Sequence, residues 1–181
     1  LHFEAVDYDT VVYVNDREVG RHVGSSDPFT FDITAALTGG DDVLTVRVID
    51  PTAPTQTRGK QTLSPKGIYY TRVSGIWQTV WLEDVPERRF AGVKMKPRIS
   101  EGTLRVLPTL AGPRREGESI RITVSDDQGF RATADASHSV TFDDAKLWSP
   151  ESPHLYDLQL DLALVEEDFS RDVVDSVQSY F

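Results

Sequence analysis

The 181-residue chain contains no cysteine, which excludes disulfide bonds and thiolate metal sites and leaves the cellular compartment open. It also has no apolar run long enough to cross a bilayer, so the sequence does not predict a membrane partner. Positive charge is scarce. The net charge is -10, and a chain without a basic face is a poor partner for a phosphate backbone, so nucleic acid is not an expected ligand.

Much of the sequence has the composition and alternation of β-strands. Hydrophobic residues make up 39% of it, which predicts a globular protein, and the length allows one or two domains. Residues 11–14 gather β-branched and aromatic side chains, and Asn15-Asp16 predicts a hairpin turn. A short helical turn is expected at residues 34–37. Alternating apolar side chains predict further strands around it, at Phe29, Phe31 and Ile33 and at Leu44, Val46 and Val48.

Residues 50–73 differ from this pattern, because they are polar, rich in Pro and Gly, and without periodicity. A loop of this length inside a compact domain is usually functional or disordered. Residues 75–83 follow with apolar side chains at both odd and even positions. That pattern predicts one strand covered on both faces.

A charged segment with a proline, residues 85–89, predicts a linker to a second module. About seven short strands in the remaining residues match the count of an immunoglobulin-like sandwich. The expected strands are residues 91–96, 102–110, 119–125, 130–134, 138–142, 156–164 and 172–181.

Two specific segments and two weaker ones carry a family resemblance. The specific ones are Arg58-Gly59-Lys60-Gln61 and Ser74-Gly75-Ile76-Trp77, and the weaker ones are residues 7–15 and 147–156. Their order resembles the non-catalytic front part of the family 2 glycoside hydrolases, the group of β-galactosidases, β-glucuronidases and β-mannosidases. The resemblance implies an all-β protein of two β-sandwich domains. These would be a truncated galactose-binding-like jelly roll at residues 1–86 and an immunoglobulin-like sandwich at residues 87–181.

The resemblance also implies a parent enzyme that hydrolyses terminal β-glycosides with retention, with a β-galactoside as first choice of substrate and a β-glucuronide as second. Such cleavage needs two carboxylates about 5 Å apart. In the family these sit on a barrel, where the acid/base glutamate follows an asparagine, whereas the single asparagine here, Asn15, precedes Asp16. We therefore expect no catalytic residue in this chain, and a role in supporting its own (β/α)8 barrel. The alternative is a non-catalytic carbohydrate-binding or adhesion module.

The loop at residues 50–73 is the expected binding site, since the corresponding loop of the resembling enzymes approaches the substrate pocket. Its cationic, amide and aromatic side chains suit sugar hydroxyls, a carboxylate or a pyranose face. They could equally be surface charges and packed aromatics. The candidate substrate-binding residues are Arg58, Lys60, Gln61, Tyr69, Tyr70 and Arg72.

Other chemistry-bearing residues have plainer interpretations. Acidic pairs at Asp41-Asp42, Asp126-Asp127, Asp143-Asp144 and residues 166–168 are expected to be solvated turn residues, with adventitious calcium as the alternative. Trp77, Trp81 and Trp148 are expected to pack in a core or between domains and not to form a sugar platform. The four histidines show no ligand spacing, and packing is expected for His154. No phosphate loop or dinucleotide fingerprint predicts a cofactor or a metal.

Both ends of the chain continue the apolar–polar alternation of a sheet, which suggests a piece of a longer protein. A cut start would hide a signal peptide, so the cytoplasm is only the default expectation for the compartment. The expected partners are a carbohydrate and the barrel of the same protein. A homo-oligomer stays open.

Overall fold

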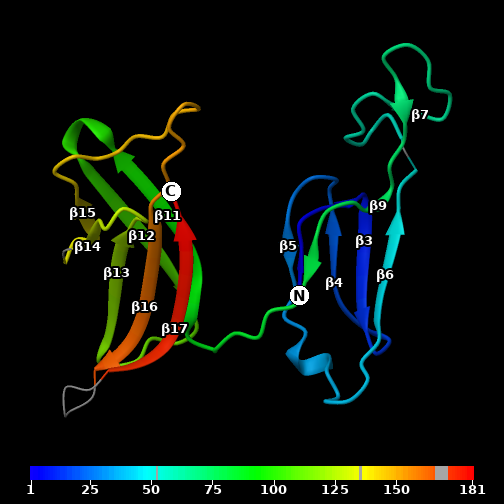
Figure 1. Cartoon of the computed structure of the whole chain (residues 1–181). Helices are drawn as coiled ribbons and strands as arrows, with labels where there is room; N and C mark the ends of the chain where they lie inside the picture. Colours follow the sequence, from blue (N-terminus) through cyan, green and yellow to red (C-terminus); the bar gives the residue numbers. More distant parts are fainter. Residues whose placement is uncertain (52, 135, 166–170) are drawn as a thin grey trace. The chain divides into compact units, whose positions relative to one another are not determined.

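The computed structural model describes residues 1–51, 53–134, 136–165 and 171–181. Almost all regular structure is β-strand, with two short 3-10 turns, η1 (Thr34–Ala36) and η2 (Ile99–Glu101). The chain divides into two compact units, Leu1–Asp84 and Val85–Phe181 (Figure 1). Within the described residues, no helix has the length and the apolar character needed to cross a membrane. The predicted all-β class is confirmed.

A three-stranded antiparallel sheet of order β4-β3-β6 forms one layer of the first unit. Its strands are β3 (Asp9–Val14), β4 (Arg17–Val23) and β6 (Leu44–Ile49). Every second residue of β3 is buried, because successive side chains of a strand point to opposite faces. The predicted turn between β3 and β4 is confirmed: Asn15 and Asp16 have φ of 50° and 62°, which suits a two-residue hairpin of type I′.

Shorter strands form the opposite layer of this unit, in a sheet of order β10-β1-β5 and a separate pair of β2 with β9. A hydrophobic core lies between the layers and is built mainly from Leu1, Phe3, Val6, Val12, Val14 and Ile33. η1 confirms the expected helical turn. The strands of this layer are β1 (His2–Phe3), β2 (Val6–Asp7), β5 (Phe29–Thr30), β9 (Gly75–Ile76) and β10 (Val80–Trp81).

The expectation of one continuous strand at residues 75–83, covered on both faces, is wrong. The segment forms β9 and β10 with an interruption, because it leaves β2 and crosses to β1. The crossing is held by backbone bonds from the Trp77 N–H to the Ala5 carbonyl and from the Glu4 N–H to the Thr79 carbonyl. In the described structure, Ile76 and Trp77 are exposed in this unit, whereas Val80 is partly buried against its core.

The second unit is a sandwich of two antiparallel sheets, of orders β11-β12-β15 and β14-β13-β16-β17 (Figure 1). All seven predicted strands are confirmed, with ends shifted by one or two residues. Their bounds are β11 (Arg89–Arg98), β12 (Thr103–Ala111), β13 (Glu118–Ser125), β14 (Arg131–Thr133), β15 (Ser139–Thr141), β16 (Asp157–Val165) and β17 (Arg171–Tyr180).

Inward side chains of both sheets meet in one core. Leu104 and Val106 of β12 lie in the same cluster as Ile122 of β13 and Leu160 of β16. An aromatic group closes one end of this core, with ring centroids 5.0 to 6.4 Å apart among Phe130, Phe142, Tyr156 and Phe181. Interdigitated side chains from two sheets are the usual way a sandwich is stabilised.

Arg88, in the charged segment at residues 85–89, is a buried part of the second unit. Its side chain is buried in the second unit, where Nε and Nη2 each lie 2.7 Å from a carboxylate oxygen of Glu118. Nη1 also donates to the Ala111 and Gly112 carbonyls. The Arg88 hydrogen bond is the main cause that lowers the pKa of Glu118. A fork-to-fork pair of this kind fixes where the chain enters the sandwich.

Candidate functional site

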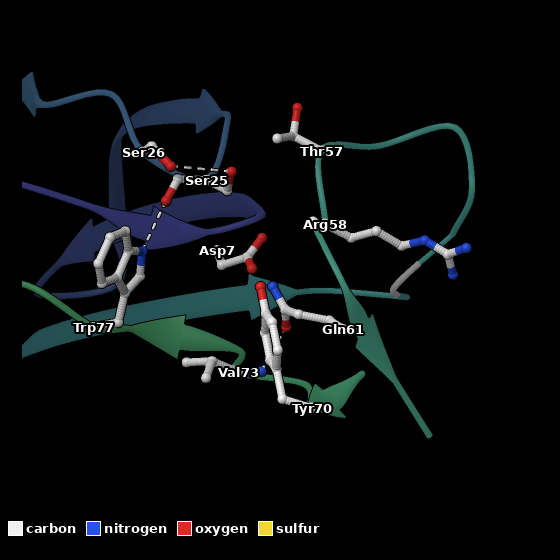
Figure 2. A pocket seen from close by; sticks show the side chains of 10 residues that line it. Asp7, Ser25, Ser26, Thr57, Arg58, Gln61, Tyr70, Val73 and Trp77 are labelled. Carbon is white, nitrogen blue, oxygen red and sulfur yellow. Dashed lines mark hydrogen bonds between the residues drawn. The ribbon is translucent and has the colours of Figure 1, made fainter. Parts of the chain in front are cut away.

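A cavity of about 260 Å³ lies in the first unit, between the sandwich and the long loop that follows β6 (Figure 2). Its walls come from four parts of the chain that are distant in sequence. Asp7 comes from β2, Ser25 and Ser26 from the segment after β4, and Trp77 from the segment after β9. The loop contributes Thr57, Arg58, Gly59, Gln61, Tyr70 and Val73.

Asp7 is the buried charge of this cavity. It is 5% exposed, and its Oδ1 atom has no hydrogen-bond partner among the described residues. Burial raises the pKa of Asp7, repulsion from Asp50 raises it further, and a hydrogen bond from Gln61 lowers it in part. A buried carboxylate oxygen without a donor is costly, so its retention suggests that something else supplies the donor.

The loop that forms the outer wall is attached by short-range contacts at its base. Gln61 lies at this base: its Oε1 accepts the Val73 N–H at 2.6 Å, and its side-chain hydrogen bonding lowers the pKa of Asp7 in part. Two short parallel strands, β7 (Gln61–Thr62) and β8 (Tyr70–Thr71), pair within the loop. Asp50 accepts hydrogen bonds from the side chains of Gln56 and Ser74. The base of the loop is therefore ordered by its own polar side chains.

Trp77 forms the aromatic wall and is not in the core of its own unit, while the expected alternative of packing between the domains stays a prediction. Its side chain is 46% exposed, and its indole N–H donates to the Ser25 carbonyl at 2.7 Å. This bond holds the indole beside the cavity (Figure 2). Trp81, which stacks on His2, and Trp148 are also exposed within their own units, so neither is a core residue.

Three of the six candidate residues line the cavity: Arg58, Gln61 and Tyr70. Lys60, Tyr69 and Arg72 lie outside its lining, on the same loop. Sequence reasoning missed Asp7, Ser25 and Ser26. No local signal marks them, because Asp7 follows Val6 as an ordinary polar residue would in a half-exposed strand, and its burial depends on segments about 20 to 70 positions away.

The acidic turns behave as capping groups. Asp42 accepts hydrogen bonds from the Thr38 backbone and hydroxyl and from the Asn15 amide, and these bonds lower the pKa of Asp42. Asp126 corrects the expectation of solvation, since its side chain is buried. That burial acts to raise its pKa, but the N–H groups of Phe130 and Gln128 together with Lys146 outweigh it and lower the pKa overall.

His154 is packed as expected, edge-on against Tyr156 with ring centroids 4.6 Å apart, and its Nε2 lies 3.3 Å from Asp126 Oδ2. Within the described ranges, no group of three or more histidine and carboxylate side chains gathers as a metal site would require. The expected acidic turn at residues 166–168 lies outside the described residues.

The described structure thus has two β-sandwich units, and the first carries a polar and aromatic cavity at a long loop. Residues 1–86 match the family described as glycosyl hydrolases family 2, sugar binding domain, and residues 93–181 match that described as glycosyl hydrolases family 2. The two matches run in order and together span nearly the whole chain. The chain belongs to glycosyl hydrolase family 2, as its sequence motifs predict.

Similar proteins agree with this assignment. A putative beta-glucuronidase of Formosa agariphila is 30% identical over 99% of this chain, and a beta-galactosidase of Thermoanaerobacter pseudethanolicus is 25% identical over 92% of it. The chain spans 22% and 24% of those two proteins, about a quarter of their length. A solved beta-glycosidase from Bacteroides vulgatus shares the fold, with a TM-score of 0.73 at 18% identity, over 99% of this chain and 22% of that one.

Proposed function

We propose that this chain is a non-catalytic N-terminal region of a retaining glycoside hydrolase that acts on terminal β-glycosides. The observation that carries the proposal is the pair of family 2 matches, in order and on two β-sandwich units. The similar proteins named as a beta-galactosidase and a putative beta-glucuronidase support the substrate class. Their much greater length leaves room for a catalytic domain.

The arrangement of carboxylates supports a non-catalytic role. Retaining cleavage needs a nucleophile and an acid/base group about 5 Å apart, both facing one sugar. Three carboxylates of the described structure serve in other ways: Asp42 and Asp126 cap turns, and Glu118 binds Arg88. Asp50 raises the pKa of Asp7 by repulsion, and it also accepts a hydrogen bond from Ser74 at the base of the loop. We assign the bond-breaking step to a barrel domain of the parent protein.

The first unit then contributes its long loop to the rim of the substrate pocket. Gln61 is bound at the base of this loop, while Lys60, Tyr69 and Tyr70 are exposed beyond it. Such a loop offers donors and aromatic faces to a sugar while the sandwich holds it in place. The six candidate residues Arg58, Lys60, Gln61, Tyr69, Tyr70 and Arg72 are proposed to contact substrate in the assembled enzyme.

A β-galactoside is the preferred substrate and a β-glucuronide the second choice. The first unit carries two carboxylates, Asp7 and Asp50, close enough for repulsion to raise the pKa of Asp7. A uronic acid would bring a third negative charge toward the same cavity. A neutral sugar avoids that repulsion.

Hydrolysis of chromogenic β-galactoside and β-glucuronide by the parent protein and by the 181-residue chain tests the proposal. The parent is expected to hydrolyse the galactoside faster, and the chain alone is expected to hydrolyse neither. Turnover by the chain that survives further purification and is lost on an acidic-to-amide substitution within it would refute the non-catalytic role. A gene that ends near Phe181 without a (β/α)8 pattern and an Asn-Glu pair would favour the carbohydrate-binding or adhesion module instead.

A further inference from the structure

The cavity of the first unit contains an acceptor that the protein itself leaves unused. Hydrogen bonding from Gln61 lowers the pKa of Asp7 in part, but Oδ1 has no partner among the described residues although Asp7 is 5% exposed. The cost of burying such an oxygen is recovered when a donor from outside reaches it. Asp7 lines the cavity, so a bound molecule has access to it.

Two of the N–H donors that line the cavity are used within the protein. The Trp77 indole N–H is used by the Ser25 carbonyl, and Gln61 is fixed between Asp7 and the Val73 N–H. Figure 2 shows the Arg58 side chain running away from Asp7. The cavity therefore presents Asp7 Oδ1 as an acceptor to a ligand that carries a donor.

The walls define the chemical class of that ligand. Trp77 and Tyr70, both about half exposed, line the cavity on either side of Asp7 (Figure 2), and aromatic faces suit the apolar face of a sugar ring. Asp7 is the carboxylate that lines the cavity, and Arg58 extends away from it, so an anionic ligand is disfavoured beside Asp7. The volume of about 260 Å³ lies just below the ~300–1,000 Å³ typical of pockets for drug-sized ligands, which suits a single ring.

We propose that Asp7 and Trp77 form a binding subsite for one neutral sugar ring, in which Asp7 Oδ1 accepts a hydrogen bond from a ring hydroxyl and Trp77 covers the ring face. The choice of a sugar rests on the proposed function, whereas the position and polarity of the subsite rest on the cavity itself. The subsite needs no other domain. It is a property of the 181-residue chain.

The indole N–H resonances of Trp77, Trp81 and Trp148 in the isotope-labelled chain provide the test, each assigned by its own Trp→Phe variant. Addition of galactose or glucose is expected to shift the Trp77 resonance in a saturable manner with a millimolar Kd. Trp81 is the matched control, because it is a half-exposed tryptophan of the same unit that lies outside the cavity. Its resonance is expected to stay in place. Glucuronate is expected to bind about tenfold more weakly than galactose.

Asp7→Asn separates the acceptor from the shape of the cavity. The amide of asparagine has nearly the size of the carboxylate. Its NH2 group either faces Gln61, where it cannot accept a hydrogen bond, or faces the ligand as a donor in place of the acceptor. We expect affinity for galactose to fall about tenfold, the loss of one charge-assisted hydrogen bond. A thermal melt of the same sample shows that the variant is folded.

If the Trp77 resonance does not move at sugar concentrations up to about 100 mM, the proposed subsite is refuted. A water molecule would then be the donor to Asp7 Oδ1. Equal affinity for galactose and glucuronate, or unchanged affinity in folded Asp7→Asn, would overturn the role of the acceptor. These measurements involve no hydrolysis. A negative result therefore leaves the glycosidase proposal standing, and an inactive parent leaves the binding result standing.

Discussion

Truncation of Leu160 to alanine should destabilise the second unit strongly and leave the first unit unchanged. Leu160 is 0% exposed at the middle of β16, opposite Ile122 of β13 and Val177 of β17. Its side chain lies in the core between the two sheets. Within each sheet, hydrogen bonds between neighbouring strands hold the strands in place. The sheets cannot close over the space left by three missing carbons without breaking these ladders.

The magnitude follows from the burial. Leu→Ala changes at fully buried sites cost about 2.7–5 kcal/mol, with the upper part of the range where the surroundings cannot collapse. A central strand with neighbours on both sides belongs to that upper part, so we expect about 4 kcal/mol. A domain of this size has a free energy of unfolding of roughly 5–15 kcal/mol, so the loss is a large share of the total.

Scanning calorimetry of the 181-residue chain measures this loss. We expect one transition for each unit, and the transition of the second unit should move down by more than about 12 °C in Leu160→Ala, since each kcal/mol shifts Tm by about 4–8 °C at this size. Arg121→Ala, an exposed position of β13 on the same sheet, is the control and should change the free energy by less than about 0.5 kcal/mol. A loss below about 1 kcal/mol for Leu160→Ala would refute the packed core, and equal movement of both transitions would refute independent units.

Three further predictions concern other parts of the structure. Gly112→Ala should destabilise the second unit by well over ~1 kcal/mol, the cost of a non-glycine residue in the left-handed region. The φ of Gly112 is 78°, and the new Cβ would also lie 2.2 Å from the Glu87 carbonyl oxygen. Gly129→Ala, with φ of 96° and open space, should cost only about that 1 kcal/mol; equal melting temperatures for the two variants would contradict the close approach. Asp7→Asn should stabilise the first unit near neutral pH. Because the folded pKa of Asp7 is raised above the ordinary 3.8, ionisation on raising the pH through the folded value destabilises the fold. The stability gained by Asp7→Asn should therefore shrink as the pH falls below the folded pKa of Asp7 toward 3.8. Urea melts at several pH values measure this gain. A gain that grows on acidification would mean that the folded pKa is lowered and not raised. Amides at residues 63–69, in the exposed part of the long loop, should exchange with deuterium faster than those of β3. Slow exchange at residues 63–69 in the isolated chain would contradict the proposal that this loop packs against another domain.

Local sequence carries most of the second unit. Its strands alternate apolar and polar side chains with a period of two, and glycine or aspartate turns separate them, so the signal for each strand lies within the strand itself. The same holds for the hairpin at Asn15 and Asp16, where two residues tolerate positive φ. These elements could be predicted because their determinants are a few residues apart.

The candidate site could be predicted only in part. Arg58, Gln61 and Tyr70 line the cavity, and the sequence points to them because their loop is long and polar, with Arg58 and Gln61 in a family-like motif. Trp77 was assigned to a core because apolar residues on both sides of a strand usually mean two covered faces. The crossing from β2 to β1 interrupts that strand and leaves Trp77 at the cavity instead.

By itself, the sequence determined the all-β class, the family, and the strands whose alternation faces a core. Only the tertiary structure decided which charges are buried. Arg88 reads as a linker residue until Glu118, 30 positions away, binds it, and Asp7 reads as a surface residue until Gln61 and the long loop cover it. The pKa of a carboxylate and the exposure of an indole depend on atoms brought together from distant parts of the chain. A period of two along one strand carries no information about those partners.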